Sequence, residues 1–341
     1  MTTISAYVTP AAKQPFVLQD IDLGPLGDDD VEIAVEHCGL CHSDLSVRNN
    51  DWHVSSYPAV LGHESIGRVV ALGSAAAKHA AKGIAVGQRV GVGWNSGSCM
   101  HCAQCIGGDQ NLCSNAEATI IDHRGGFASR LRTHWAWALP IPDGLNASEA
   151  GPLLCGGITV FSPLDCYAKP TSHVGIIGIG GLGHMAVKFA AAMGCEVTAF
   201  SSSERKFDEA RKFGAHHVVS SRDPAAIKKL AGQLDLVIST VNVKLDWDAY
   251  IATLAPYGRL HVVGAVLEPI PVTAMSLIFG SKSVSGSPTG SPSKMAEMLY
   301  FAARKNVTPQ TEHFPMSKIN DAFEHLEAGK ANYRIVLDAD F

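Results

Sequence analysis

The sequence of 341 residues predicts an α/β protein that joins a β-rich region to a doubly wound parallel sheet. From about residue 4 to residue 139, short alternating stretches such as 31–35 are separated by glycine, a pattern typical of half-buried strands. From residue 173 the pattern changes to buried strands that alternate with helical segments. Six strands with helices between them predict a parallel sheet with crossovers on both faces.

The elements of the second region follow from hydrophobic periodicity and glycine punctuation. The six strands are expected at 174–177, 196–200, 217–219, 234–238, 260–263 and 283–285. Further along, 295–305 has a helical pattern and 333–338 predicts a final strand. A helix that begins near Ser148 is expected to carry Cys155.

Composition restricts the classes of protein that this chain can belong to. Hydrophobic residues make up 46% of the chain, which is enough to form the cores of two domains of ordinary size. A formal charge of −5 argues against a nucleic-acid partner. The first residues lack a secretion signal and no apolar run reaches about 18 residues, so we expect a cytoplasmic protein without a membrane partner. Its nine cysteines are then interpreted as metal ligands or buried thiols.

The stretch 38–44 (CGLCHSD) holds two thiols, an imidazole, a hydroxyl and a carboxylate. Thiolate and neutral imidazole are typical zinc ligands, and a catalytic zinc usually has three protein ligands and one open position. More distant ligands are therefore needed, and His63 and Cys155 are the candidates. Spacing alone leaves open whether Cys38 or Cys41 takes part.

A second cysteine cluster lies in a loop, with spacings of three, three and eight residues, at Cys99, Cys102, Cys105 and Cys113. Four thiolates can close a tetrahedral site completely, which predicts a structural zinc. Free thiols or a redox pair are the first alternative. A nucleic-acid-binding zinc ribbon is the second, and it is disfavoured because the loop lacks a basic face.

A glycine-rich turn between the first strand and the first helix of the second region predicts a dinucleotide site, formed by Gly178, Gly180, Gly181, Leu182 and Gly183. Glycines there let a pyrophosphate approach the helix N-terminus.

The cofactor is expected to be NADP(H) rather than NAD(H). The second strand ends in Ser201, Ser202 and Ser203, followed by Arg205 and Lys206, where an NAD site places a carboxylate. Hydroxyl and cationic groups suit a 2′-phosphate. The alternative is that the serines only cap the next helix.

With these motifs the chain resembles the zinc-dependent medium-chain alcohol dehydrogenases, in particular the NADP-dependent branch similar to cinnamyl alcohol dehydrogenase. The matching segments are 38–44, 62–64, the four-cysteine loop, 153–157, 178–183 and 201–206. The resemblance implies a GroES-like catalytic domain formed by residues 1–147 and 288–341. A Rossmann NADP-binding domain would occupy residues 148–287.

The same resemblance assigns roles around the catalytic zinc. It implies that Cys41, His63 and Cys155 are the protein ligands. Glu64 would lie behind the metal, where it can replace water as a ligand. Asp44 would orient the imidazole of His63, as zinc sites commonly require.

The resemblance also implies roles at the substrate and the cofactor. Ser43 would bond the substrate oxygen and pass on its proton, and His42 would contact the cofactor pyrophosphate. Many relatives continue the proton relay through a histidine, but this chain has Ser46 there, which has no pKa near neutrality. Trp94 matches a pocket-lining position, and Trp52 is expected to line the same pocket.

The predicted function is therefore hydride transfer between NADP(H) and a primary alcohol or aldehyde, aromatic or medium-chain aliphatic. We expect two zinc ions per chain, one catalytic and one structural, and a homodimer, with a tetramer as the alternative. A polyol or amino-alcohol dehydrogenase is the first alternative function. A zinc- or cofactor-binding protein without turnover is the second.

Overall fold

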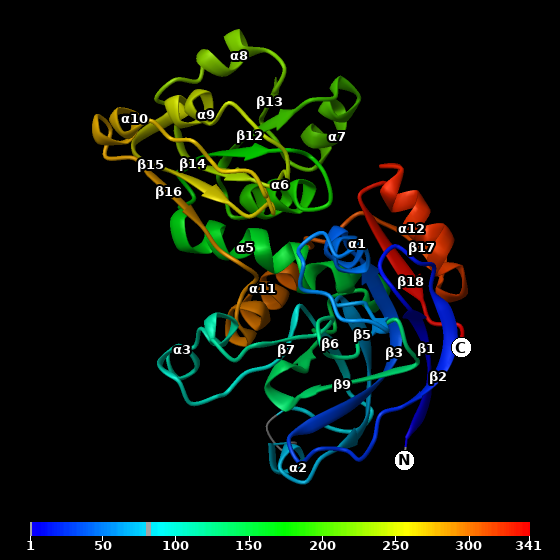
Figure 1. Ribbon diagram of the computed structural model, residues 1–341. Helices are drawn as coiled ribbons and strands as arrows, with labels where there is room; N and C mark the ends of the chain where they lie inside the picture. The colour runs from blue at the N-terminus through cyan, green and yellow to red at the C-terminus, as the bar shows by residue number, and fades with distance from the viewer. Residues whose placement is uncertain (1, 80–82) are drawn as a thin grey trace. The chain divides into compact units, whose positions relative to one another are not determined.

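The computed structural model describes residues 2–79 and 83–341 (Figure 1). The chain forms two compact units, and each is built around its own sheet. Unit 1 comprises Met1–Cys155 and Gly290–Phe341, and unit 2 comprises Gly156–Thr289. The predicted domain boundaries, after residue 147 and before residue 288, remain a prediction of where the functional domains divide.

Unit 1 contains a seven-stranded sheet. Its strand order is β10-β6-β5-β3-β18-β17, and β9 pairs with β3. The strands are β3 (Asp30–Leu40), β5 (Ser65–Leu72), β6 (Arg89–Val92), β9 (Arg130–His134), β10 (Leu139–Pro140), β17 (Thr311–Pro315) and β18 (Arg334–Asp338). Figure 1 shows β18, from the end of the chain, beside β3 from its beginning. The tail thus completes the sheet formed by the N-terminal part.

Two smaller sheets and several short helices complete unit 1. The first sheet has the order β2 (Val17–Asp22), β1 (Thr3–Thr9), β4 (Ala59–Val60), and the second pairs β7 (Asn95–Gly97) with β8 (Glu117–Ala118). The α-helices are α1 (His42–Asn49), α2 (Ala76–His79), α3 (Ala103–Ile106), α4 (Ala147–Ala150), α11 (Pro292–Lys305) and α12 (Ile319–Glu327). The 3-10 helices are η2 (Gln110–Leu112), η3 (Trp135–Trp137), η4 (Gly151–Leu154) and η6 (Met316–Lys318).

Unit 2 is a parallel sheet with the order β13-β12-β11-β14-β15-β16. The strands are β11 (His173–Ile177), β12 (Glu196–Ser201), β13 (His217–Ser220), β14 (Leu234–Ser239), β15 (Leu254–Val262) and β16 (Ser283–Gly286). The helices are α5 (Gly156–Tyr167), α6 (Gly183–Ala192), α7 (Phe207–Lys212), α8 (Pro224–Lys228), α9 (Trp247–Thr253), α10 (Ala274–Ile278) and η5 (Glu204–Lys206). This is the strand order of a Rossmann fold, and the predicted fold class is confirmed.

Burial explains why the sequence forms these two sheets. In β3, Val31, Ile33 and Val35 are buried at alternate positions, as expected for a strand that packs one face on a core. In β11, Val174 and the following residues are buried on both faces, which is typical of a central parallel strand. In the described part of the chain, no helix combines the length and apolar character that crossing a bilayer requires.

The expectation that a helix carries Cys155 is wrong. Helix α4 ends at Ala150, η4 follows, and Cys155 has the non-helical angles φ −123° and ψ −78° before α5 begins. Pro152 lacks an amide hydrogen, so the helical hydrogen-bond ladder cannot continue through it. Cys155 therefore lies at a break between two helical segments.

Candidate active site

Three adjacent strands of unit 1 bring the predicted zinc ligands together. Strand β3 is antiparallel to both β5 and β18, so its C-terminal end lies beside the N-terminal ends of the other two. Cys41 directly follows β3, His63 and Glu64 directly precede β5, and Arg334 is the first residue of β18. The pairing of Leu40 with Ile335 places Arg334 next to Cys41. Sheet register alone thus assembles most of the site.

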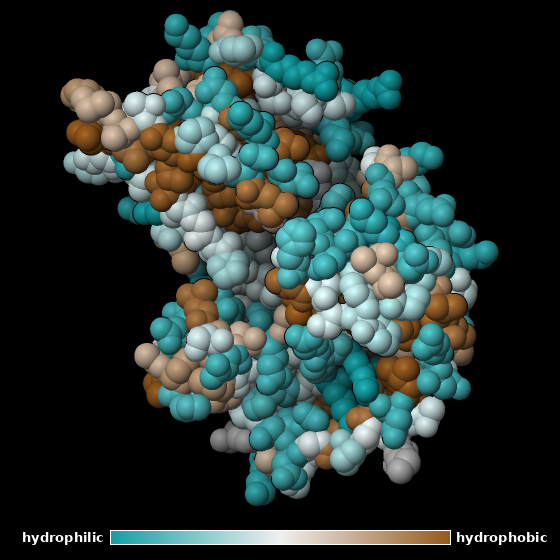
Figure 2. Space-filling view, in the orientation of Figure 1, coloured by the Kyte–Doolittle hydropathy of each residue, from teal (hydrophilic) through white to brown (hydrophobic). Residues whose placement is uncertain are grey.

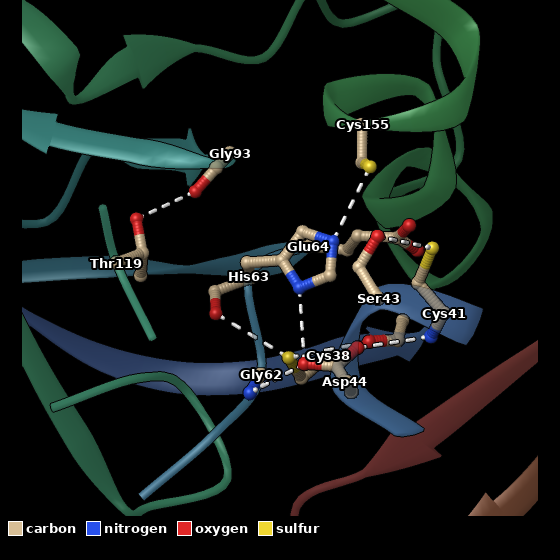
Figure 3. Close-up of polar contacts among 12 residues, drawn as sticks. Cys38, Cys41, Ser43, Asp44, Gly62, His63, Glu64, Gly93, Thr119 and Cys155 are labelled. Atoms are coloured by element: carbon tan, nitrogen blue, oxygen red, sulfur yellow. Dashed lines mark hydrogen bonds and ion pairs between the residues drawn. The ribbon is translucent and has the colours of Figure 1, made fainter. Parts of the chain in front are cut away.

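The ligand atoms of Cys41, His63, Glu64 and Cys155 all lie within 4.8 Å of one another, and all four residues are buried. In Figure 3 the thiol of Cys155 faces the imidazole of His63, and their Sγ and Nε2 atoms are 3.2 Å apart. Two thiols, an imidazole and a carboxylate are the donor set of a catalytic zinc site. The Glu64 Oε2 atom is buried and lacks a hydrogen-bond partner within the described residues, which also fits a cation.

Asp44 fixes the orientation of His63. Its Oδ1 lies 3.0 Å from Nδ1 of His63 and accepts the Gly62 amide at 3.0 Å, and its Oδ2 accepts the Cys41 amide at 3.0 Å. A carboxylate only accepts, so Nδ1 carries the hydrogen and Nε2 is left to bind a metal. Burial opposes a proton on His63, but Asp44 raises the pKa of the imidazole well above its usual value.

The two thiols have different proton affinities. A hydrogen bond from Cys155 holds the pKa of Cys41 well below its usual value, and the positive charge of Arg334 adds to this effect. The same hydrogen bond, together with burial, raises the pKa of Cys155. Cys41 is therefore the thiolate of the pair, and binding of a metal ion would require Cys155 to lose its proton as well.

Arg334 is a residue of this site that the sequence analysis missed. Its side chain is 4% exposed, its Nη2 forms an ion pair with Oε1 of Glu64, and its Nη1 lies 4.0 Å from the Cys41 sulfur. Burial raises the pKa of Glu64 to about 7, against the opposing effect of Arg334. The available signal was one arginine directly before the apolar run 335–337.

Glycine at position 39 explains part of the motif that carries Cys41. A Cβ atom at Gly39 would lie 2.0 Å from Oε2 of Glu64, so any side chain there would displace the carboxylate. The thiol of Cys38 points elsewhere, with its sulfur 3.4 Å from the Ser65 hydroxyl, and burial raises its pKa. The structure therefore groups Cys41, and not Cys38, with the other ligand atoms.

The remaining predicted residues of unit 1 surround this cluster. The Ser43 hydroxyl lies 3.8 Å from the Cys41 sulfur, and a dashed line in Figure 3 marks this contact. His42 is exposed at the start of α1. The ring of Trp94 meets the His63 imidazole edge-on at a centroid distance of 5.1 Å. Trp52 packs on Trp94 at 6.1 Å. Trp94 therefore contacts a residue of the metal-ligand cluster directly, and Trp52 contacts Trp94.

The four-cysteine loop forms a second cluster around α3. The ligand atoms of its four cysteines also lie within 4.8 Å of one another. The sulfur of Cys113 is 3.5 Å from that of Cys99 and 3.8 Å from that of Cys102. Amides of His101 and Cys102 donate to Cys99 and lower its pKa to about 6. Such a set fits a closed tetrahedral zinc.

Three of the four glycines in the turn of unit 2 have different structural roles. Gly178 has φ +87°, and a Cβ atom there would lie 2.3 Å from Val241. A Cβ atom at Gly183 would lie 1.7 Å from the Gly178 oxygen, so the helix could not approach the strand. A Cβ atom at Gly180 would meet nothing within 4 Å, so the space beside this residue is open. Gly181 and Leu182 join this turn to α6.

The serine segment lies at the end of β12. Ser201 is buried and its hydroxyl donates to the Ser203 carbonyl at 3.0 Å, whereas Ser202 is exposed. The Lys206 ammonium donates to the Ile179 carbonyl at 2.9 Å, which ties this segment to the glycine turn. Both elements of the predicted cofactor site are therefore adjacent within unit 2.

Two features define the class of this protein as a zinc-dependent dehydrogenase. One is the Rossmann sheet of unit 2, and the other is the buried cluster of thiol, imidazole and carboxylate groups in unit 1. Residues 27–143 match the family described as alcohol dehydrogenase GroES-like domain, and residues 181–304 match the family described as zinc-binding dehydrogenase. The chain belongs to the zinc-dependent medium-chain alcohol dehydrogenases, in the branch of cinnamyl alcohol dehydrogenase. The predicted resemblance is confirmed.

Individual relatives agree over nearly the whole chain. The chain is 51% identical to aldehyde reductase AdhA of Synechocystis sp., over 98% of each sequence. A cinnamyl alcohol dehydrogenase from Sorghum bicolor superposes with a TM-score of 0.92 at 37% identity, covering 99% of this chain and 98% of that chain. A second structure, cinnamyl alcohol dehydrogenase from Helicobacter pylori complexed with NADP(H), gives a TM-score of 0.89 at 30% identity, with coverage of 99% and 98%.

Proposed function

We propose that this chain is an NADP-dependent alcohol dehydrogenase that reduces aldehydes to primary alcohols and catalyses the reverse reaction. The observation that carries the proposal is the convergence of Cys41, His63 and Cys155 on one buried point, with Glu64 beside them. The names of its relatives, an aldehyde reductase and cinnamyl alcohol dehydrogenases, support the same reaction.

Zinc held by Cys41, His63 and Cys155 would polarise an aldehyde oxygen and lower the pKa of an alcohol. The residues of the chain prepare this position. Asp44 holds the imidazole in one tautomer, so that the Nε2 lone pair faces the two sulfurs. Arg334 balances the negative charge of Glu64 and lies beside the Cys41 thiolate. Every ligand is buried, so the electrostatic interactions among these groups are only weakly screened by water.

Ser43 is the proposed proton donor to the substrate oxygen. Its hydroxyl lies beside the Cys41 sulfur, so it faces the ligand cluster. A serine hydroxyl can donate to an alkoxide and take a proton from water in turn. Ser46 cannot act as the terminal base because its hydroxyl does not titrate near neutrality, so we propose that protons leave through water.

NADP(H) bound to unit 2 would supply and accept the hydride. We propose that the pyrophosphate contacts the amides of the 178–183 turn and that the 2′-phosphate contacts Ser202, Ser203 and Lys206. The open space at Gly180 and the link from Lys206 to the turn support this assignment. The NADP(H) named with the Helicobacter pylori structure supports the choice of cofactor. We propose further that His42 contacts the pyrophosphate.

We propose that Trp52 and Trp94 select flat aromatic or linear aliphatic aldehydes. Trp94 packs edge-on against His63, one of the proposed metal ligands, which supports a place for its ring beside the bound aldehyde. Large aromatic rings provide apolar contact area and exclude branched substrates.

A substrate panel tests the proposal. Benzaldehyde, cinnamaldehyde and butanal are assayed with NADPH and with NADH, alongside sorbitol and threonine in the oxidative direction, after zinc has been counted. Two zinc ions per chain and NADPH-dependent aldehyde reduction are expected. Higher kcat/KM on sorbitol or threonine would favour a polyol or amino-alcohol dehydrogenase. One structural zinc ion per chain and no turnover on any substrate would favour a zinc- or cofactor-binding protein.

We also propose that the protein works in the cytoplasm as a homodimer formed through unit 2. Strand β16 is the last strand of the six-stranded sheet, so one of its edges carries no neighbour among the described residues. In nearby α10, Met275, Ile278 and the following Phe279 are exposed by 51%, 65% and 84%. Figure 2 shows hydrophobic side chains over this part of unit 2. Sedimentation that gives twice the chain mass is expected, and four times the mass would indicate the tetramer.

A further inference from the structure

A third cluster of metal-binding side chains lies in unit 2, away from both cysteine clusters. It consists of His173, Glu196 and His217, the first residues of β11, β12 and β13. Their ligand atoms lie within 4.8 Å of one another, as in the catalytic and four-cysteine clusters. We propose that this cluster binds one late transition-metal cation, for which Zn²⁺ is the probe, in addition to the two zinc ions of the family.

Sheet register explains why these side chains converge. His173 pairs with Glu196 across β11 and β12, and Thr198 pairs with His217 across β12 and β13. Paired residues of neighbouring strands point to the same face, and so do residues two positions apart in one strand. His173, Glu196, Thr198 and His217 therefore share one face at the N-terminal ends of three strands.

Neighbouring groups hold the three ligands in place. The Nε2 of His173 lies 2.7 Å from the hydroxyl of the buried Thr198, and the amide of His173 donates to Asp235 at 2.8 Å. The Nε2 of His217 lies 2.7 Å from Oε1 of Glu196. The contacts of His173 with Thr198 and Asp235 are of the kind that orients a metal ligand, whereas the His217–Glu196 contact joins two of the proposed ligands themselves. The carboxylates of Glu196 and Asp235 add negative charge at this end of the sheet, which favours a cation.

The chemistry of the cluster selects the type of ion. Two imidazoles and one carboxylate suit zinc, copper or nickel, whereas magnesium and calcium prefer oxygen ligands. The side chains of His217 and Glu196 are 53% and 54% exposed, so water would fill the open coordination positions. The site is therefore open and exchangeable, unlike the closed four-cysteine site.

This cluster is separate from the proposed cofactor site. Glu196 begins β12 and Ser201 ends it, a separation of about 17 Å at the usual rise of a strand. A cation at the cluster would link the starts of three strands and stabilise unit 2 without touching the cofactor. Aldehyde reduction is therefore expected to be unchanged in variants of the cluster.

The test counts zinc on the holoenzyme. After dialysis to two zinc ions per chain, calorimetric titration with Zn²⁺ at pH 7.5 is expected to show one further equivalent that Mg²⁺ does not displace. Glu196→Gln and His217→Ala are each expected to weaken this third equivalent about tenfold or more. His216→Ala is the matched control, because Nδ1 of His216 accepts the Val197 amide and is not part of the cluster.

The outcomes separate the possibilities. Loss of the third equivalent in both cluster variants, with normal binding in His216→Ala and normal aldehyde reduction in all three, supports the proposal. Absence of a third equivalent in the parent protein overturns it. Retention of that equivalent in Glu196→Gln and His217→Ala, or its loss in His216→Ala, overturns the ligand set.

Discussion

Replacing Arg334 by methionine tests how the buried charges of the metal-ligand cluster around Cys41 and His63 are balanced. Methionine keeps much of the apolar volume of the side chain but removes its charge. The side chains of Arg334 and Glu64 are 4% and 0% exposed, so the variant leaves a carboxylate buried without its partner. Removing one member of a buried pair costs about 3–5 kcal/mol, whereas an exposed pair contributes about 0.2–1 kcal/mol. For a unit of about 200 residues, this predicts a melting temperature lower by about 6–20 °C.

The assay is denaturant unfolding combined with zinc analysis of the same samples. We expect Arg334→Met to lower the free energy of unfolding by the stated amount and to weaken zinc binding by about 10- to 100-fold. Arg68→Met is the matched control, because Arg68 pairs with Glu36 at 3.0 Å but its side chain is 48% exposed. In the double variant Glu64→Gln with Arg334→Met, the uncompensated charge is absent and part of the loss should be recovered. If Arg334→Met costs no more than Arg68→Met, the reasoning about this pair is wrong.

Three further predictions concern other parts of the chain. Ser202→Asp is expected to lower kcat/KM with NADPH by about 10- to 100-fold, because a carboxylate repels the 2′-phosphate, and to leave kcat/KM with NADH nearly unchanged. An unchanged ratio of the two kcat/KM values would contradict the assignment of Ser202 to the 2′-phosphate site. Burial, with help from Arg259, lowers the pKa of His261 to about 4. The unfolded chain therefore gains a proton that the folded protein does not as pH falls from 6.5 towards 4, which costs up to about 3 kcal/mol of stability. When the free energy of unfolding is measured in urea at several pH values, the His261→Gln variant should lose less stability than the parent protein between pH 6.5 and pH 4. If stability falls equally with pH in both proteins, the role given to His261 is wrong. Finally, Cys155→Ala should abolish aldehyde reduction with little change in melting temperature, whereas Cys102→Ala should lower the melting temperature; equal thermal stability of the two variants would contradict the division into a catalytic and a structural zinc.

The sequence analysis succeeded where chemistry or periodicity is visible within a short stretch. The alternation of strands and helices after residue 173 identified the parallel sheet, because each βαβ unit is local in the chain. The four cysteines were found by spacing, since one loop supplies them all. Cys41 was preferred to Cys38 only through the family resemblance, since both thiols are equally suitable as ligands in the sequence.

The features that were missed depend on which strands are neighbours. Arg334 lies 270 residues from Glu64, and only the pairing of β18 with β3 brings them together. His173, Glu196 and His217 are each separated by more than 20 residues, and the register of three parallel strands collects them. The position of Cys155 was missed for a local reason, because helix signals near Ser148 were followed past Pro152. Strand pairing has no short-range signature, so such sites require the tertiary structure.

A count of the charges explains why the metal-ligand cluster needs Arg334, which comes from the end of the chain. Two thiolates and a neutral imidazole cancel the charge of a zinc ion, which leaves the carboxylates of Asp44 and Glu64. Asp44 is stabilised by the amides of Cys41 and Gly62 and by His63, so its charge is dispersed over three donors. Among the described residues, no hydrogen bond reaches Oε2 of Glu64, so its charge depends on Arg334. Because an unpaired charge is costly in a buried site, the strand that carries Arg334 is as necessary to the metal centre as the segments that carry its ligands.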